Sequence, residues 1–256
     1  DGVKVRNRSH AIESLISQSM TPAINQALIL AAGQGVKMRP FTYEIPKPML
    51  PVKGLPILDH IINQLRDNDI KDITIVIGHL GEQIQNYFGD GSKFGVNIRY
   101  ISEKAQSRTA GPLKLAKSIL QNQSFIMIYG DVLAKINLRE FINYHLQFGH
   151  IATLALTSVP DPSAYGAVRM SGHKIVELIE KPKISDSVSR LVTAGIQILT
   201  PDIYKYLPSK QYTMLEEDVF PILAKEGQLI GYLFEGQWFD VGTPAVYEKA
   251  LRDWHN

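Results

Sequence analysis

The chain has 256 residues, of which 45% are apolar and 20% are charged, a composition typical of a globular protein with a full hydrophobic core. The formal net charge is only +2, without the basic excess that is typical of nucleic-acid-binding proteins. The sequence also contains no run of about 20 apolar residues that would predict a membrane span. Cysteine is absent, which excludes disulfides, thiolate catalysis and zinc–thiolate sites and agrees with a reducing compartment. We therefore expect a cytoplasmic protein that binds neither nucleic acid nor a membrane.

Residues 1–25 stand apart from the rest of the sequence. Charges are spread through them and they lack an apolar h-region, so they do not have the pattern of a secretory signal. We interpret residues 1–25 as an N-terminal extension, which is a tag, a linker or the tail of a preceding domain. The main domain is assigned to residues 26–256.

In the first half of this domain, about residues 26–160, short apolar runs alternate with amphipathic helical patterns. Strand patterns occupy 27–32, 72–78, 97–103, 124–131 and 151–159, and helical patterns occupy 59–69, 111–120 and 137–149. In the last helix Asn137 is a candidate N-cap, with Glu140 three residues later and Gly149 as the stop. Near-continuous apolar strands between helices predict an α/β sheet covered on both faces.

In the second half, about residues 161–256, strand and helix patterns alternate less regularly. Strand patterns occupy 165–170, 174–182, 191–199 and 229–234, and helical patterns occupy 201–207 and 216–227. We expect a smaller α+β part that lies over the first half. Because ligands of α/β sheets bind beyond the carboxyl ends of the strands, the residues that directly follow strands are the candidates for function.

The sharpest pattern follows the first strand, where Gly33 and Gly35 lead into a basic loop that is rich in proline. The glycines would allow backbone N–H groups to approach a polyphosphate closely. Lys37, Arg39 and Lys47 follow on this loop, which the prolines stiffen, so their charges would be preorganised. The spacing fits neither a Rossmann fingerprint nor a Walker A loop, and a tight turn beside a solvated basic loop explains the same residues equally well.

Two aspartates are candidate metal ligands. Asp131 ends an apolar strand pattern, and Asp240 lies between a short aromatic run and a Gly-Thr-Pro turn. Two carboxylates that are distant in sequence can converge on one hard cation that also binds phosphate oxygens, as magnesium commonly does. A cap or turn role explains each aspartate by itself as well.

The glycine loop resembles the signature of the sugar-1-phosphate nucleotidyltransferases, a family that includes mannose-1-phosphate guanylyltransferases and glucose-1-phosphate thymidylyl- and uridylyltransferases. The matching positions are Leu30, Ala31, Ala32, Gly33, Gly35, Pro40, Thr42 and the run PKPMLPV at 46–52. Val36 and Lys37 stand where the family usually has Thr and Arg, and lysine keeps the charge of arginine without its bidentate fork. The resemblance implies a Rossmann-like mixed sheet flanked by helices, with a smaller α+β sugar-binding part.

Further segments resemble the family in the expected order. RTAGPLKLAK at 108–117 is similar to the family's helix start near the base and ribose, with Arg108 in place of a glycine. The resemblance therefore implies nucleotide-binding roles for Leu30, Ala31, Ala32, Gly33, Gly35, Thr109, Ala110 and Gly111. It also implies that Lys37 and Arg39 contact the β- and γ-phosphates and that Lys47 contacts the α-phosphate.

On the sugar side, YGAV at 165–168, ELIEKP at 177–182 and TAGIQIL at 193–199 resemble three more family segments. By this resemblance Gly166 lets the sugar approach, Glu180 bonds a sugar hydroxyl and Lys181 holds the sugar phosphate. Thr193 stands where the family usually has Asn. EEDVFPILAKEG at 216–227 also resembles the family, with Glu217 and Asp218 in its acidic portion; we interpret this helical pattern as architectural, with substrate contact as the alternative.

The implied reaction transfers a nucleoside monophosphate from a nucleoside triphosphate to a hexose 1-phosphate, giving a nucleoside diphosphate sugar and pyrophosphate. Asp131 and Asp240 would hold Mg²⁺, and no general base is needed because the attacking phosphate is already anionic. Two alternatives stay open: a phosphocholine-type cytidylyltransferase of the same fold, and a catalytically weak paralogue that acts as a sugar-nucleotide sensor or assembly subunit. The identity of base and sugar, and homo-oligomerisation, are also open.

Overall fold

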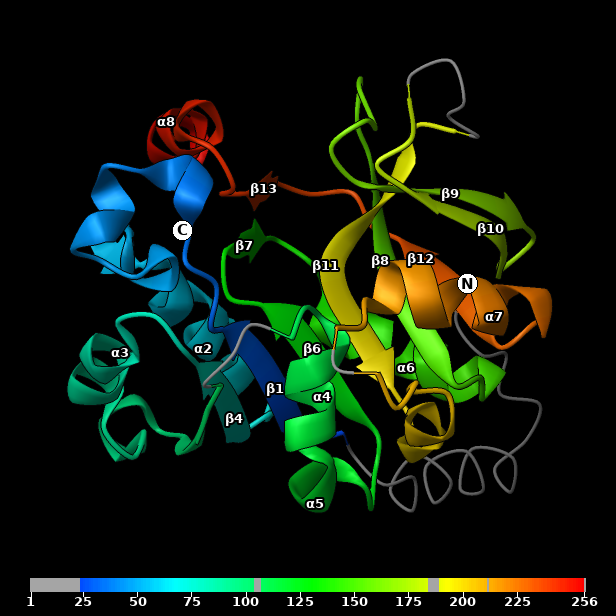
Figure 1. Cartoon of the computed structure of the whole chain (residues 1–256), viewed down its shortest axis with the longest axis horizontal. Helices are drawn as coiled ribbons and strands as arrows, with labels where there is room; N and C mark the ends of the chain where they lie inside the picture. Colours follow the sequence, from blue (N-terminus) through cyan, green and yellow to red (C-terminus); the bar gives the residue numbers. More distant parts are fainter. Residues whose placement is uncertain (1–23, 104–106, 184–188, 211, 256) are drawn as a thin grey trace, which may run out of the picture.

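The computed structural model describes residues 24–103, 107–183, 189–210 and 212–255. Apart from Ile24 and Asn25, the predicted N-terminal extension lies outside these ranges. A mixed sheet of nine strands runs through the described part of the chain, with helices packed on it (Figure 1). In spatial order its strands are β5 (Asn97–Ser102), β4 (Asp72–Ile77), β1 (Gln26–Ala31), β6 (Phe125–Tyr129), β11 (Leu191–Leu199), β8 (Ala152–Ser158), β12 (Leu229–Leu233), β10 (Lys174–Glu180) and β9 (Gly166–Ser171).

The four strands at one end of the sheet are parallel, so their carboxyl ends meet at one edge. β5, β4, β1 and β6 pair in that order, and Leu30 of β1 lies opposite Tyr129 of β6. β11 pairs antiparallel with both β6 and β8, and the antiparallel pair β10–β9 completes the sheet. The predicted α/β fold with a mixed sheet flanked by helices is confirmed, and strands from both halves of the domain belong to this one sheet.

The α-helices are α2 (Ile57–Asp67), α3 (Gly81–Phe88), α4 (Ala110–Leu115), α5 (Lys117–Leu120), α6 (Leu138–Phe148), α7 (Phe220–Lys225) and α8 (Pro244–Asp253). Short 3-10 turns lie at Val36–Met38, Phe41–Tyr43, Lys47–Met49, Ser92–Phe94 and Pro201–Lys205. A π-helical turn, η7, spans Leu215–Val219. None of the helices in the described ranges has the length and apolar character needed to cross a membrane.

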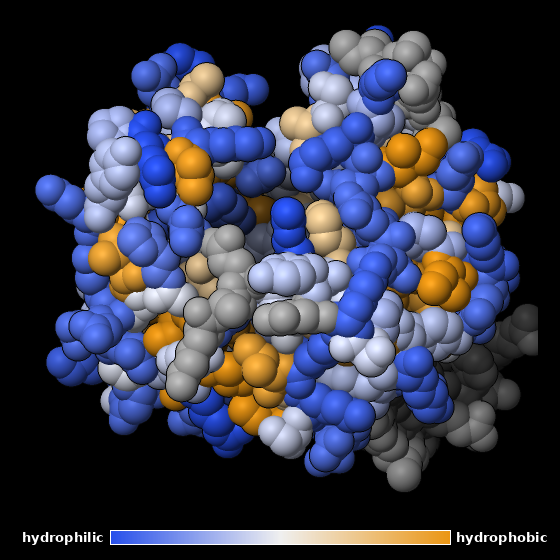
Figure 2. Space-filling model, in the orientation of Figure 1, coloured by the Kyte–Doolittle hydropathy of each residue, from blue (hydrophilic) through white to orange (hydrophobic). Residues whose placement is uncertain are grey.

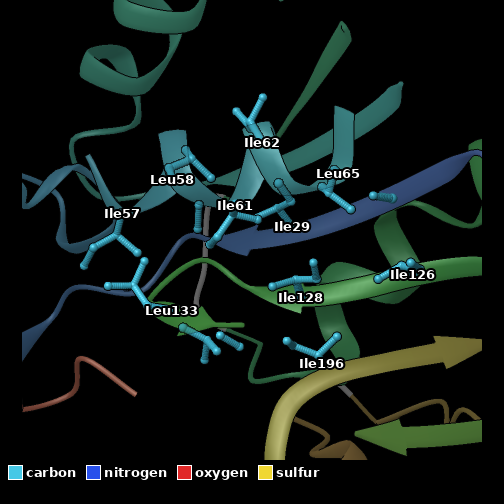
Figure 3. Close-up of a cluster of buried hydrophobic side chains, with 14 of the residues drawn as sticks. Ile29, Ile57, Leu58, Ile61, Ile62, Leu65, Ile126, Ile128, Leu133 and Ile196 are labelled. Carbon is cyan, nitrogen blue, oxygen red and sulfur yellow. The ribbon is translucent and has the colours of Figure 1, made fainter. Parts of the chain in front are cut away.

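Alternate residues of a strand point to opposite faces of the sheet, and each face packs on its own layer of helices. Ile29 of β1 belongs to the cluster beneath α2, where Leu58, Ile61 and Leu65 cover β1 and β6 (Figure 3). Leu28, the next residue of β1, belongs to a second cluster that includes residues of α4, α5 and α7. Burial on both faces explains why such strands are near-continuous apolar runs in the sequence.

Several helical predictions differ from the structure in detail. The helix predicted over 111–120 is interrupted at Ala116, which separates α4 from α5. The helix predicted over 201–207 is a 3-10 turn, and the one predicted over 216–227 begins as a π-helical turn. The sequence patterns did not indicate α3 or α8, which are short and bury few large apolar side chains.

A two-stranded ribbon beside the main sheet joins segments that are far apart in the sequence. β7 (Val132–Ala134) pairs antiparallel with β13 (Trp238–Asp240), which places Asp240 opposite Val132. The amide N of Val241 donates a hydrogen bond to the carbonyl O of Asp131 over 2.9 Å. The ribbon therefore brings Asp240 next to the residues that directly follow β6. A second short pair joins β2 (Pro51–Val52) to β3 (Leu55–Pro56).

The predicted boundaries of α6 are confirmed. The side chain of Asn137 accepts a hydrogen bond from the amide N of Glu140 over 3.2 Å, and Gly149 has a left-handed φ of 61° at the C-terminal end. Phe141 of this helix is fully buried, with its ring 5.2 Å from that of Tyr232 between centroids. α6 thus has a capped start, a glycine stop and an aromatic anchor in the core.

We expect Phe141→Ala to lower the free energy of unfolding by about 3–5 kcal/mol, because it removes a buried ring and leaves a cavity. Asn143→Ala, at an exposed position of the same helix, is the control and should change it by less than about 0.5 kcal/mol. Urea denaturation of both variants measures the difference. Equal losses would contradict the assignment of Phe141 to the core.

Candidate active site

Two adjoining cavities open at the edge of the sheet where β1 and β6 end. The larger has a volume of about 550 Å³ and the smaller about 270 Å³. Both are lined by Lys47, Thr109, Tyr129 and Asp131, so these residues form the boundary between them. Figure 2 shows the surface hollowed in the upper middle of the view, between the part that carries α8 and the part that carries β9 and β10.

Most of the predicted site residues line these cavities. The larger cavity is lined by Gly35, Lys37, Lys47, Thr109, Asp131, Gly166, Glu180, Lys181, Thr193 and Asp240, and the smaller one by Leu30, Ala31, Ala32 and Gly33 together with Lys47, Thr109 and Asp131. The structure thus brings the glycine loop, both aspartates and the predicted sugar-side segments to one place.

Three predicted residues lie elsewhere. Arg39 is exposed and its guanidinium carbon lies 5.0 Å from the centroid of the Tyr43 ring, outside the lining of both cavities. Ala110 and Gly111 are buried behind the cavity walls, and the amide N of Ala110 donates to the carbonyl O of Thr213 over 3.1 Å. Of the three residues of the helix start that were predicted to bind the nucleotide, only Thr109 therefore lines the cavities, whereas the neighbouring Arg108 and Pro112 line the smaller one.

Hydrogen bonds to one glycine shape the loop after β1. Gly35 has a left-handed φ of 62°, and its carbonyl O accepts bonds from Thr42 Oγ1 at 2.7 Å and from the amide N of Met38 at 2.8 Å. A Cβ on Gly35 would lie 2.8 Å from Thr42 Cγ2, so this turn requires glycine. Around Gly33, by contrast, no atom lies within 4 Å of such a Cβ, and the backbone faces open space.

A lysine and two aspartates form the charged centre of the larger cavity. Lys47 is ion-paired with Asp131, and each side chain is only 18% exposed. Burial by itself lowers the pKa of Lys47, but the charge of Asp131 and its hydrogen bond raise that pKa above the ordinary value. Burial, followed by repulsion from Asp131, raises the pKa of Asp240 to about 7, although nearby lysines act in the opposite direction. Two carboxyl groups thus lie beside Lys47 between the ends of β6 and β13, and burial disfavours the charged form of Asp240.

The opposite wall of the larger cavity joins β9, β10 and β11. A Cβ on Gly166 would lie 3.1 Å from both Glu180 Oε2 and Thr193 Oγ1, so the three residues are in close contact. Lys181 Nζ lies 2.7 Å from Glu180 Oε1, and this hydrogen bond raises the pKa of Lys181. Lys181 is mostly exposed while Glu180 is nearly buried, so the carboxylate lies beneath the more exposed cation.

A bulge in β11 positions Thr193. The pairing of β11 with β8 shifts between Thr193 and Gln197, and Gly195 within the bulge has a left-handed φ of 73°. A Cβ on Gly195 would lie 2.9 Å from Val132 Cγ2, so glycine is required by packing as well as by backbone conformation.

The lining residues that were not among the sequence predictions include Tyr129, Glu216 and Trp238. Tyr129 comes two positions before Asp131, a spacing that could have suggested a shared edge. Trp238 is in the same segment as Asp240, and its indole Nε1 donates to the carbonyl O of Ala194 over 3.0 Å. Glu216 begins the segment 216–227, which is interpreted from the sequence as architectural with substrate contact as the alternative, and no single residue of it was predicted to line the site.

Comparisons with known proteins match this geometry to one family. A family profile described as "Nucleotidyl transferase" matches residues 26–256. A UTP–glucose-1-phosphate uridylyltransferase of Synechocystis sp. is 33% identical over 242 residues, covering 89% of this chain and 62% of that protein. A probable mannose-1-phosphate guanylyltransferase of Oryza sativa subsp. japonica is 34% identical over 233 residues, covering 89% of this chain and 64% of that protein.

The chain therefore spans less than two thirds of the length of these two relatives. Among solved structures, a putative glucose-1-phosphate thymidylyltransferase of Bacillus anthracis, in complex with a sucrose, is similar with a TM-score of 0.83 and 28% identity. That similarity covers 90% of this chain and 96% of the other.

We expect Gly35→Ala to lower the free energy of unfolding by about 1–3 kcal/mol, because it combines left-handed strain with a clash against the Thr42 methyl group. Thr42→Ser removes that methyl group and keeps the hydroxyl that bonds Gly35. The double variant should therefore be more stable than the sum of the two single losses predicts, as measured by urea denaturation. Strictly additive losses would show that the contact with Thr42 is unimportant.

Proposed function

Because the chain belongs to the nucleotidyl transferase family, we propose that it transfers a nucleoside monophosphate from a nucleoside triphosphate to a hexose 1-phosphate, forming a nucleoside diphosphate sugar. The observation that carries the proposal is the larger cavity itself. It joins the glycine loop, a paired lysine and aspartate, and the Gly166–Glu180–Lys181 wall. A triphosphate, a cation and a sugar phosphate each find residues of suitable chemistry there.

In this proposal the triphosphate lies along the glycine loop. Gly33 and Gly35 leave their backbone open to the cavities, and Lys37 and Lys47 supply positive charge from the same loop. Lys47 is held in place by Asp131, so its ammonium is oriented before the ligand arrives. Arg39 would reach the outer phosphates only by leaving the ring of Tyr43.

The two aspartates suit a magnesium ion. Among the described residues there is no cluster of three or more His, Cys, Asp or Glu side chains that could hold a metal. Two carboxyl groups brought together at one cavity, such as those of Asp131 and Asp240, nevertheless match the usual magnesium site, in which phosphate oxygens and water complete the coordination. When bound, Mg²⁺ would neutralise charge on the phosphate oxygens.

The reaction consists of one displacement at phosphorus. An oxygen of the sugar 1-phosphate attacks the α-phosphorus, a new P–O bond forms, and the bond to the β-phosphate oxygen breaks to release pyrophosphate. Lys181 would hold the attacking phosphate and Lys47 would stabilise charge on the α-phosphate. Because the attacking oxygen is already anionic, catalysis depends on positioning and charge stabilisation.

The hexose would lie against the wall formed by β9, β10 and β11. Gly166 allows close approach there, and the nearly buried carboxylate of Glu180 is a strong acceptor for a sugar hydroxyl. The relatives are named for different bases and sugars. One is named for uridylyl transfer to glucose 1-phosphate and another for guanylyl transfer to mannose 1-phosphate. The substrates are therefore a nucleoside triphosphate and a hexose 1-phosphate, and experiment must identify the base and the sugar.

A matrix of nucleoside triphosphates and hexose 1-phosphates, assayed for pyrophosphate release with Mg²⁺, tests the activity. We expect one pair to be turned over, with loss of turnover on chelation of the metal. Asp131→Asn and Asp240→Asn should each reduce turnover by on the order of a hundredfold or more. Asp202→Asn, which alters an exposed ion pair with Lys205, is the control. No turnover with any pair, or full activity of both aspartate variants, would refute the proposal.

Gly33→Ala tests the placement of the nucleotide. We expect its melting temperature to match that of the wild type, because the added methyl group meets no protein atom within 4 Å. The methyl group would occupy the smaller cavity, so KM for the triphosphate should rise at least about tenfold while KM for the sugar phosphate changes little. An unchanged KM for the triphosphate would place the nucleotide elsewhere.

A further inference from the structure

A buried carboxylate that was not among the predicted site residues contributes to the wall of the larger cavity. Glu216 lies in the π-helical turn η7 and is only 6% exposed. Burial raises its pKa, and repulsion from Glu180 raises it further. A buried carboxylate is unfavourable unless its charge and hydrogen bonds are compensated, and π-helical turns are frequent at functional sites. The groups that compensate the charge of Glu216 therefore indicate the role of this side chain.

Two hydroxyl groups fix the orientation of Glu216. Thr109 Oγ1 donates to Glu216 Oε2 over 2.7 Å, and the Tyr129 hydroxyl donates to Oε1. Thr109 Oγ1 also accepts a bond from the amide N of Leu215 at 2.9 Å, which ties η7 to the start of α4. Among the hydrogen bonds of the described residues, each carboxylate oxygen accepts one, so each keeps acceptor capacity for a ligand in the cavity.

Other bonds attach the same segment without the charge of Glu216. The amide N of Ala110 donates to the carbonyl O of Thr213 at 3.1 Å. Asp218 Oδ2 accepts from the amide N of Met214 at 2.8 Å, and its Oδ1 is paired with Lys210 at 2.7 Å. Attachment of η7 to α4 therefore does not explain why a carboxylate is kept at the cavity wall.

The surroundings of Glu216 place it on the sugar side. It lines the larger cavity and not the smaller one, together with Gly166, Glu180 and Lys181. After the hydrogen bond from Glu180, attraction to Glu216 is among the causes that raise the pKa of Lys181. Two buried carboxylates thus lie near one lysine, and a hexose presents several hydroxyl donors that such acceptors can distinguish.

Resting on the proposed function, we propose that Glu216 is a specificity-determining residue that accepts a hydrogen bond from a hydroxyl group of the hexose 1-phosphate, at a different position on the ring from the hydroxyl that Glu180 contacts. Thr109 and Tyr129 hold the carboxylate in place for this contact. The sugar is then read by two fixed acceptors on separate elements, β10 and η7.

Glu216→Gln keeps the shape of the side chain and weakens it as an acceptor. With the substrate pair that the wild type uses best, we expect KM for the hexose 1-phosphate to rise about ten- to a hundredfold. KM for the triphosphate should stay within about twofold. Glu217→Gln removes the same charge from the exposed neighbouring residue, which lines neither cavity, and should leave both constants unchanged.

Deoxy analogues of the hexose 1-phosphate identify the contact. The analogue that lacks the hydroxyl bonded by Glu216 should be a poor substrate for the wild type, but no worse than the parent sugar for Glu216→Gln. Glu216→Asp, which keeps the charge and withdraws it by one methylene, should show the same selective rise in KM for the sugar. It serves as the test if the glutamine variant does not fold.

The outcomes separate this inference from the proposed function. If the wild type turns over a pair and the Glu216 variants keep its KM for the sugar and its preference among the deoxy analogues, the inference is wrong and the proposed function stands. Equal rises in both KM values with a lower melting temperature would assign Glu216 a structural role, which also overturns it. If the wild type turns over no pair, the proposed function fails and the inference fails with it.

Discussion

The confinement of two carboxyl groups in a largely buried place at the end of β6 is the constraint around which the cavity is organised. Burial first, and then the charge of Asp131, raises the pKa of Asp240. Asp131 follows β6 directly, and pairing of β7 with β13 brings Asp240 against it through backbone hydrogen bonds. The backbone thus holds together two groups that would separate if only their side chains were involved. Lys47 offsets part of the charge by its ion pair with Asp131, yet the pKa of Asp240 is still raised to about 7. Such a perturbed group in a cleft is typical of a functional site.

The second wall of the cavity depends on one irregular strand. β11 continues the parallel half of the sheet by pairing with β6, and it also pairs with β8 and touches β9. The bulge at Gly195 turns Thr193 toward Gly166 and Glu180 while the strand still reaches β6. The glycine is therefore required for the shape of the sheet, and strand pairing, instead of a loop, places Gly166, Glu180 and Thr193 in this wall.

The sequence predicts much of this arrangement because burial leaves a local pattern. Strands such as β1 and β6 are buried on both faces, so continuous apolar runs reveal them, and residues after their carboxyl ends, such as Gly33 and Asp131, are natural candidates. α3 left little signal because Ile84 and Phe88 are its only large buried side chains. The apolar helical pattern of α3 therefore extends over only a few residues.

The part of the site that the sequence could not predict depends on long-range contacts. Glu216 meets Thr109 across 107 positions of the chain, and no spacing encodes that hydrogen bond. Arg39 belongs to the same basic loop as Lys37, but only the three-dimensional course of the loop turns Arg39 toward Tyr43 and away from the cavities. Residue type and order were sufficient to predict that Gly33, Gly35, Asp131 and Asp240 line the cavities, whereas they did not predict the side-chain direction of Arg39 or the burial of Gly111.

Strand pairing across the whole sheet also limits how the molecule can move. Backbone hydrogen bonds from β11 join β6, next to the glycine loop, to β8 and to β9 in the second wall of the cavity. Rotation of the two walls of the cavity apart as rigid bodies would break these ladders, so strand pairing opposes such a motion. Any adjustment to ligands of different size must come from the loops and side chains at the rim, while the floor keeps a fixed width.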